Sequence, residues 1–182
     1  MQRVTLCTMM VVFAGCATSP RPAERTTDER VTISAPTGVV ADMNLTRSQY
    51  VGGGVVPAAR AEVWALLPAV YEELGMPAPA TDRSSWTVAV QRHSIRRTLG
   101  GQRLSTFLAC GRDMTGELAD SHRITLSVRT WLESAGTAST AVHSMIEATA
   151  TSVEGRAGSS TCSSRGELER RITAAVREHA ER

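Results

Sequence analysis

The sequence contains no lysine, few aromatic residues and, beyond its first residues, no long apolar run. Because all 20 basic residues are arginines, mechanisms that need a side-chain amine, such as a Schiff base or a P-loop lysine, are excluded. A formal net charge of +2 over 182 residues, without a strongly basic stretch, argues against a nucleic-acid-binding protein. The remaining composition is that of one globular domain.

The first residues have the pattern of a secretory signal. Arg3 precedes an apolar run over residues 4–14, and Gly15 and Cys16 follow. A positive charge, about ten apolar residues and then small residues are typical of a cleaved signal peptide. The run is shorter than the roughly 20 apolar residues that cross a bilayer.

The end of this segment, Phe13-Ala14-Gly15-Cys16, resembles a bacterial lipobox, with Phe13 where Leu is usual. The resemblance implies that residues 1–15 are a lipoprotein signal peptide and that Cys16 becomes the lipid-bearing N-terminus. Ala17, in place of Asp, implies by the same resemblance the outer membrane, with the protein facing the periplasm. The alternative is a plain secretory signal with a chance cysteine.

Residues 16–30 hold two prolines and mixed polar residues without apolar periodicity. Such a segment cannot bury enough surface to offset the entropy of ordering, so we expect a flexible tether. The tether leads into a single domain over residues 31–182.

Cys110 and Cys162 are the cysteines that remain in the mature domain. In an oxidising periplasm, such a pair predicts a disulfide bond. The alternatives are a reactive thiol or a metal site. A metal needs three or four ligands, and no CxxC, HxxxH or HExxH spacing accompanies either cysteine, so no metal or other cofactor is expected.

Two segments have the apolar spacing of helices. Residues 57–74 carry one stripe, end at Gly75 and contain Pro68, which should bend the helix. Residues 164–181 carry a second stripe and begin with Ser164 and Glu167 in the spacing of a capping box. The stripes consist of Val63, Trp64, Leu67, Val70, Tyr71 and Leu74 in the first helix, and of Leu168, Ile172, Ala175 and Val176 in the second.

Between the helices, residues 86–153 predict an antiparallel sheet. Strands are expected at residues 86–92, 104–110, 122–133 and 140–153, after a turn over Asp82-Arg83-Ser84-Ser85. Residues 31–56 are expected to form an irregular arm or edge strands, and Gly52-Gly53-Gly54 a flexible or bulged strand, because the glycines lack the spacing of a phosphate loop. The prediction is a two-layer α+β fold, with an antiparallel meander of about four to six strands packed against two helices.

This order of elements resembles a helix-grip domain. The Trp-bearing helix that ends in Leu74-Gly75, the turn at Asp82-Arg83-Ser84, the strand near Trp86, the meander and the closing helix resemble in particular the BamC-type lipoproteins of the outer-membrane β-barrel assembly machinery. The cysteine pair and the single domain after a short tether depart from that family's pattern, which argues against a direct role in barrel assembly.

No constellation of residues predicts an enzyme. The four histidines are dispersed, and no serine lies in a GxSxG context. Cys110, His122 and Asp113 could be combined into a nucleophilic site, but a disulfide-bonded sulfur is not a nucleophile.

Three large apolar residues, Phe107, Trp131 and Met145, fall on the polar side of their predicted strands and form a candidate partner surface. A β-bulge that reverses the alternation, or cover by residues 39–50, would be the alternative explanation. Four arginines, Arg92, Arg96, Arg97 and Arg103, surround the first predicted hairpin and are candidate contacts for phosphate groups of lipid or lipopolysaccharide. The alternative is a solvated hairpin.

The expected function is that of a non-enzymatic, lipid-anchored interaction or scaffold module whose partners are the membrane, through its lipid, and an unidentified envelope protein. The alternative is a carrier of a small apolar ligand in a cavity between helix and sheet, which requires a gap of several hundred Å³.

Overall fold

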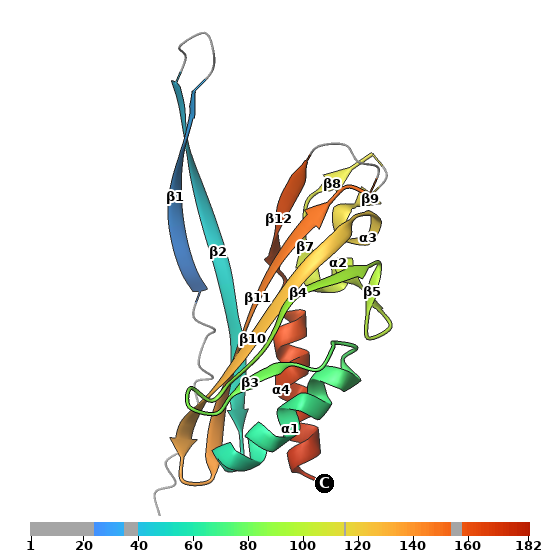
Figure 1. Cartoon of the computed structure of the whole chain (residues 1–182). Coiled ribbons are helices and arrows are strands. Elements are labelled where there is room, and N and C mark those ends of the chain that lie inside the picture. The colour runs from blue at the N-terminus through green and yellow to red at the C-terminus, as the bar shows by residue number, and fades with distance from the viewer. Residues whose placement is uncertain (1–23, 35–39, 115, 154–157) are drawn as a thin grey trace, which may run out of the picture.

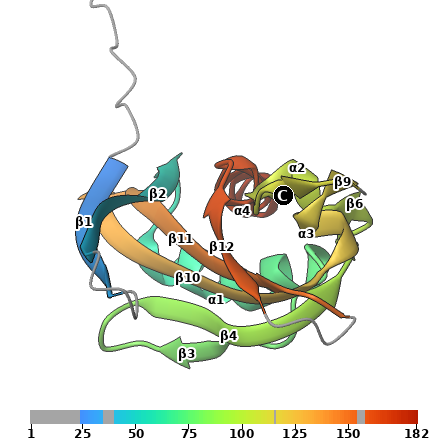
Figure 2. The same cartoon turned by 90° about the horizontal axis from the view of Figure 1, so that it is seen from above.

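A computed structural model describes residues 24–34, 40–114, 116–153 and 158–182, with side chains from Gly52 onward. Cys16 and the predicted signal lie outside the described residues. The main sheet has the strand order β1-β2-β11-β10-β4-β3, with β12 beside β11, and every pairing is antiparallel. Helices α1 and α4 lie on one face of this sheet (Figure 1), which curves around α4 (Figure 2). The predicted two-layer α+β fold is confirmed.

The elements have the following bounds. The strands are β1 (Glu24–Ser34), β2 (Val40–Val56), β3 (Ala80–Asp82), β4 (Thr87–Arg96), β5 (Thr98–Leu99), β6 (Gln102–Arg103), β7 (Leu108–Ala109), β8 (Arg112–Asp113), β9 (Gly116–Glu117), β10 (Arg123–Gly136), β11 (Ser139–Thr151) and β12 (Ser159–Ser164). The helices are α1 (Arg60–Glu73), α2 (Leu104–Phe107), α3 (Leu118–Ser121) and α4 (Glu167–Ala180).

The N-terminal segment forms strands at one edge of the main sheet, one of the two predicted alternatives, and these strands make a long hairpin. Strand β1 pairs with β2 from Glu24 opposite Tyr50 to Ser34 opposite Val40. The hairpin extends beyond the rest of the sheet (Figure 1), and the last residues of β2 then pair with β11. The tether prediction is therefore wrong for residues 24–30. Composition did not reveal that β2 supplies hydrogen-bond partners for this polar stretch.

Helix α1 ends within one residue of its predicted end and begins three residues after its predicted start at residue 57. Its buried residues are Val63, Leu67, Val70 and Tyr71, which recur at helical spacing. Gly75, with φ of 77°, ends the helix, because its N–H donates to Glu72 O while Met76 N donates to Tyr71 O. The helix continues through Pro68, whose ring is exposed.

Helix α4 begins at Glu167, and the predicted capping box is wrong. Gly166, with φ of 76°, precedes the helix, so Ser164 lies too early to bind its first free N–H groups. Instead, the Ser164 hydroxyl accepts a hydrogen bond from Gly166 N at 3.0 Å and donates one to Glu169 Oε1 at 2.7 Å.

The predicted strand over residues 104–110 is also wrong in its first half. Leu104–Phe107 form the helical turn α2, and only Leu108–Ala109 form a strand, β7. The turn places Leu104 and Phe107, which are three residues apart, on the same buried side. Phe107 is therefore a core residue.

The Cys110–Cys162 disulfide is present, as predicted. Strand β7 pairs with β12 through Ala109 opposite Ser163, and the two cysteines continue this pairing with Cα atoms 4.0 Å apart. The bond therefore connects the segment after β7 with the strand that leads into α4. By chain entropy, a loop of this size contributes about 4 kcal/mol as an upper figure.

The glycines of β2 allow β11 and α4 to approach this strand closely. They belong to a regular strand without a bulge. A Cβ on Gly53 would lie 2.2 Å from the carbonyl oxygen of Val142 in β11. A Cβ on Gly54 would lie 3.0 Å from the Thr173 methyl group, which belongs to α4. The glycines therefore permit the packing of β2 against its neighbours.

Candidate functional site on the outer face of the sheet

The two faces of the sheet differ in what covers them. Along β10, the residues toward the helices are buried, from Ile124 through Leu126, Val128 and Thr130 to Leu132. The alternate residues point away from the helices and are half-buried or exposed. We call this second surface the outer face; its central residues are Ala89, Ser127, Arg129, Trp131, His143, Met145 and Glu147.

A bulge between β4 and β10 hollows the outer face. Leu126 pairs with His93 and Val128 with Val90, so Gln91 and Arg92 together oppose Ser127. Arg92 has φ of 52°, and its backbone N–H donates to the Ser127 hydroxyl at 3.1 Å. The hydrogen bond and the left-handed residue hold the bulge.

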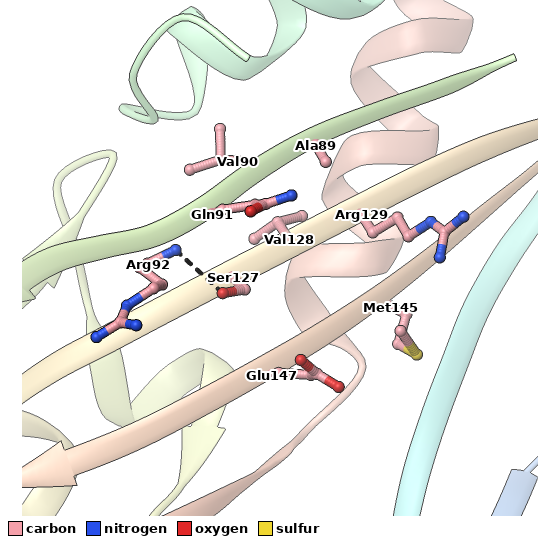
Figure 3. Close-up of a pocket in the computed structure, with 9 residues that line it drawn as sticks. All are labelled: Ala89, Val90, Gln91, Arg92, Ser127, Val128, Arg129, Met145 and Glu147. Atoms are coloured by element: carbon pink, nitrogen blue, oxygen red, sulfur yellow. Dashed lines mark hydrogen bonds between the residues drawn. The ribbon is translucent and has the colours of Figure 1, made fainter. Parts of the chain in front are cut away.

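The hollow is a groove of about 320 Å³ across three strands. Figure 3 shows it from the side opposite to the helices, with Arg92 and Arg129 pointing away from each other at its two ends. Its lining includes Gln91 and Arg92 from β4, Ser127 and Val128 from β10, and Met145 and Glu147 from β11. The groove therefore offers both polar and apolar contacts.

Trp131 lies on the outer face, two residues along β10 from Arg129, which lines the groove. Its ring stacks on His143 of β11, with centroids 5.3 Å apart and planes 20° apart. The indole N–H donates to Glu133 Oε1 at 3.3 Å, and His143 Nε2 lies 3.6 Å from Glu133 Oε2, beyond hydrogen-bond distance. These contacts fix the position of Trp131 without burying it completely.

The structure therefore divides the predicted partner surface. Trp131 and Met145 share the outer face, because Trp131 pairs with His143 and Met145 is two residues further along β11. No bulge reverses the alternation at either residue. The prediction for Phe107 is wrong: it is 2% exposed, and the guanidinium of Arg171 lies 5.3 Å from its ring centroid.

The predicted arginine cluster is also divided. Arg92 lies at the groove, Arg96 lies further along the same strand, and Arg97 follows the strand with φ of 66°. Arg103 is occupied elsewhere, since its guanidinium binds Asp120 at 2.7 Å. Partial burial acts to raise the pKa of Asp120, but hydrogen bonds from Ser105 and Arg103 hold that pKa below its usual value.

Sequence reasoning missed two arginines that the fold adds to this surface. Arg123 and Arg129 alternate with the buried residues of β10, so both lie on the outer face. Arg123 is paired directly with Arg96 across β4 and β10. The alternation of β10 in the sequence places both side chains outward, but only the register with β4 pairs Arg123 with Arg96 and puts Arg129, opposite Ala89, on the same face as Arg92.

Between the helices and the sheet, the side chains are closely packed. The hydroxyl groups of Tyr71 in α1 and Thr130 in β10 share a hydrogen bond of 2.9 Å, and Thr130 makes another with Ser144. Burial raises the pKa of Tyr71 to about 12, although the Thr130 bond lowers it in part. Ile172, Val176 and Leu168 of α4 are also buried against the sheet.

The residues considered for catalysis are not combined into a site. Cys110 is in the disulfide, and His122 Nδ1 shares a hydrogen bond with its neighbour Ser121. Within the described chain, no group of three or more His, Cys, Asp or Glu residues could hold a metal ion, and no described helix is long and apolar enough to cross a membrane.

Comparisons of the chain with protein-family models, with curated proteins and with solved structures find no match. The geometry of the outer face is therefore the basis for the functional proposal.

Proposed function

We propose that this protein is a non-enzymatic lipoprotein, anchored through Cys16 at the periplasmic side of the outer membrane, that binds an envelope protein through the outer face of its sheet. This proposal rests on one observation: helices cover one face of the sheet and not the other. The helices close one face, while Trp131, Met145 and the groove remain on the other. Aromatic and apolar side chains on an uncovered sheet face are typical of interaction surfaces.

The alternative, a carrier of a small apolar ligand between helix and sheet, has less support. Tyr71 reaches from α1 to Thr130 on the sheet at hydrogen-bond distance, and Val63, Leu67 and Val70 beside it are 0% exposed. A carrier would need several hundred Å³ in this region. The groove of about 320 Å³ that the described residues form lies on the outer face.

The interaction can be tested with the double variant Trp131→Ser/Met145→Ser in the native cell. We expect the wild-type protein, solubilised gently from membranes, to migrate on a native gel in a complex larger than the monomer, and the double variant to lose that complex. Met114→Ser is the matched control, because Met114 is fully exposed in the β8–β9 turn, away from the outer face. Equal loss in the control, or an intact complex in the double variant, would contradict the proposal, provided that thermal unfolding shows both variants folded.

The anchor is tested separately by Cys16→Ala. Without the thiol no lipid can be attached, so we expect the protein to move from the membrane fraction to the soluble periplasmic fraction. A protein that stays in the membrane fraction after a high-salt wash would show that something other than this lipid holds it there.

A further inference from the structure

The arginines whose side chains the structure describes, from Arg60 onward, fall into two groups. One group has partners: Arg103, Arg112, Arg170, Arg171 and Arg182 bind carboxylates, Arg165 and Arg177 donate to backbone carbonyls, and Arg60 and Arg83 lie over the ring of Trp86. The other group makes no side-chain contact of these kinds within the described residues. Its members are Arg92, Arg96, Arg97, Arg123 and Arg129.

The unpartnered group gathers in one place. Arg92, Arg96, Arg123 and Arg129 belong to β4 and β10 and lie along the outer face; we call these four residues the arginine strip. Arg129 lies six positions after Arg123, which is about 20 Å in a strand. The groove lies between these ends.

The arginine strip places two like charges side by side, which lowers the stability of the folded domain. Arg96 and Arg123 are direct cross-strand partners. Like charges in this position repel each other and destabilise a sheet. A partner with negative charges would turn this repulsion into attraction.

From this placement we infer that the outer face binds an extended acidic peptide segment of the partner, with the carboxylates of that segment along the arginine strip. The inference rests on the proposed function and gives the partner's chemistry. Carboxylates suit arginine because the planar guanidinium can donate two parallel hydrogen bonds to them. An extended segment suits the length of the strip, and the groove can admit a side chain between the charged ends.

The surface fits a peptide better than an anionic bilayer. Glu133 and Glu147 carry carboxylates on the same face, and a flat anionic membrane would meet them together with the arginines. Ser127 lies within a groove, where a bilayer surface does not reach but a peptide side chain does. Trp131 stacks on His143 and its indole N–H donates to Glu133, so its polar edge is already bound on this face.

The test uses the full-length protein in non-ionic detergent and a fluorescent probe peptide, five repeats of Glu-Ser, which in extended form is longer than the strip. We expect the probe to bind, and its Kd to rise at least tenfold in Arg123→Gln/Arg129→Gln and when salt is raised about fourfold. The matched control is Arg170→Gln/Arg182→Gln, which removes two exposed arginines of the opposite layer and should leave Kd within about twofold of wild type.

A stability measurement separates binding from a structural role. Because Arg123→Gln relieves the repulsion with Arg96, we expect this variant to unfold at the same or a higher urea concentration than wild type while its affinity falls. Loss of stability together with affinity would assign the strip a structural role and overturn the inference.

Three further outcomes would also overturn it. The first is equal affinity for a peptide of five Gln-Ser repeats, and the second is equal weakening by the control variant. The third concerns vesicles that contain phosphatidylglycerol, with pure phosphatidylcholine vesicles as the reference. If Arg123→Gln/Arg129→Gln weakens binding to the phosphatidylglycerol vesicles but leaves the Kd of the peptide unchanged, the strip binds a membrane and not a peptide. If Trp131→Ser/Met145→Ser disrupts the native complex but the strip variant does not, the interaction module stands and only its acidic partner segment is refuted.

Discussion

Buried polar side chains of this domain bind specific neighbours, but two buried atoms of the described residues, His143 Nε2 and Glu169 Oε2, have no hydrogen-bond partner. The hydroxyl groups of Tyr71, Thr130 and Ser144 satisfy one another beneath α1. Glu169 differs, because its side chain is fully buried at the start of α4 and Oε2 has no hydrogen-bond partner among the described residues. Burial raises the pKa of Glu169, although the Ser164 hydrogen bond and the charge of Arg170 act against that rise.

The raised pKa of Glu169 predicts a pH-dependent stability. Below the usual glutamate pKa the side chain is protonated in both the folded and the unfolded chain, and its contribution is intact. As the pH rises through the folded-state pKa, the unfolded chain loses its proton more readily, so stability falls. We expect Glu169→Gln to raise the free energy of unfolding by about 1–2 kcal/mol at pH 7 and to have little effect near pH 4. Urea unfolding at the two pH values measures this, and an equal effect at both would contradict it.

The elements follow from the sequence where their patterns are long. The alternation in β10 and the apolar stripe of α1 predicted both elements and the direction of their buried sides. Short elements were less predictable: α2 is a single turn, and its only signal was that Phe107, three residues after Leu104, broke the alternation of the expected strand. The bulge at Arg92 had no visible signal either, because a left-handed arginine is not marked by glycine.

The candidate site was predicted only in part for the same reason. The outward placement of Trp131 follows from the alternation within β10, and that of Met145 from the alternation within β11. Both alternations can be read from the sequence. The joining of Arg92 and Arg96 with Arg123 depends on the register between two strands, which the intervening residues do not encode locally.

The contact between β2 and β11 can be tested at Gly53. A methyl group there would meet the Val142 carbonyl oxygen at 2.2 Å, so the strands would have to separate locally. We expect Gly53→Ala to lower the free energy of unfolding by about 2 kcal/mol or more. Gly158→Ala is the matched control, since no atom lies within 4 Å of the place its methyl group would take, and it should change stability by less than about 0.5 kcal/mol. Similar values for both variants in urea unfolding would show that β2 is not closely packed at Gly53.

At the scale of the whole molecule, the domain is a curved sheet with one closed and one open face. Helices α1 and α4 close the concave side, where the core is continuous from Val56 to Val176. The opposite side carries Trp131, Met145, the groove and the arginine strip. A lipid at Cys16 would concentrate this open face at the membrane surface, where an envelope protein could bind it.

The most direct test of binding through the outer face is site-specific photo-crosslinking in the native cell. A photoreactive amino acid is incorporated at the position of Met145 on the outer face and, in a parallel strain, at the position of Ala174, which is exposed on α4. We expect a discrete crosslinked product with an envelope protein from position 145, its loss in the Trp131→Ser background, and no such product from position 174. The same product from both positions, or a product from position 174 alone, would contradict the claim that the outer face of the sheet is the binding surface.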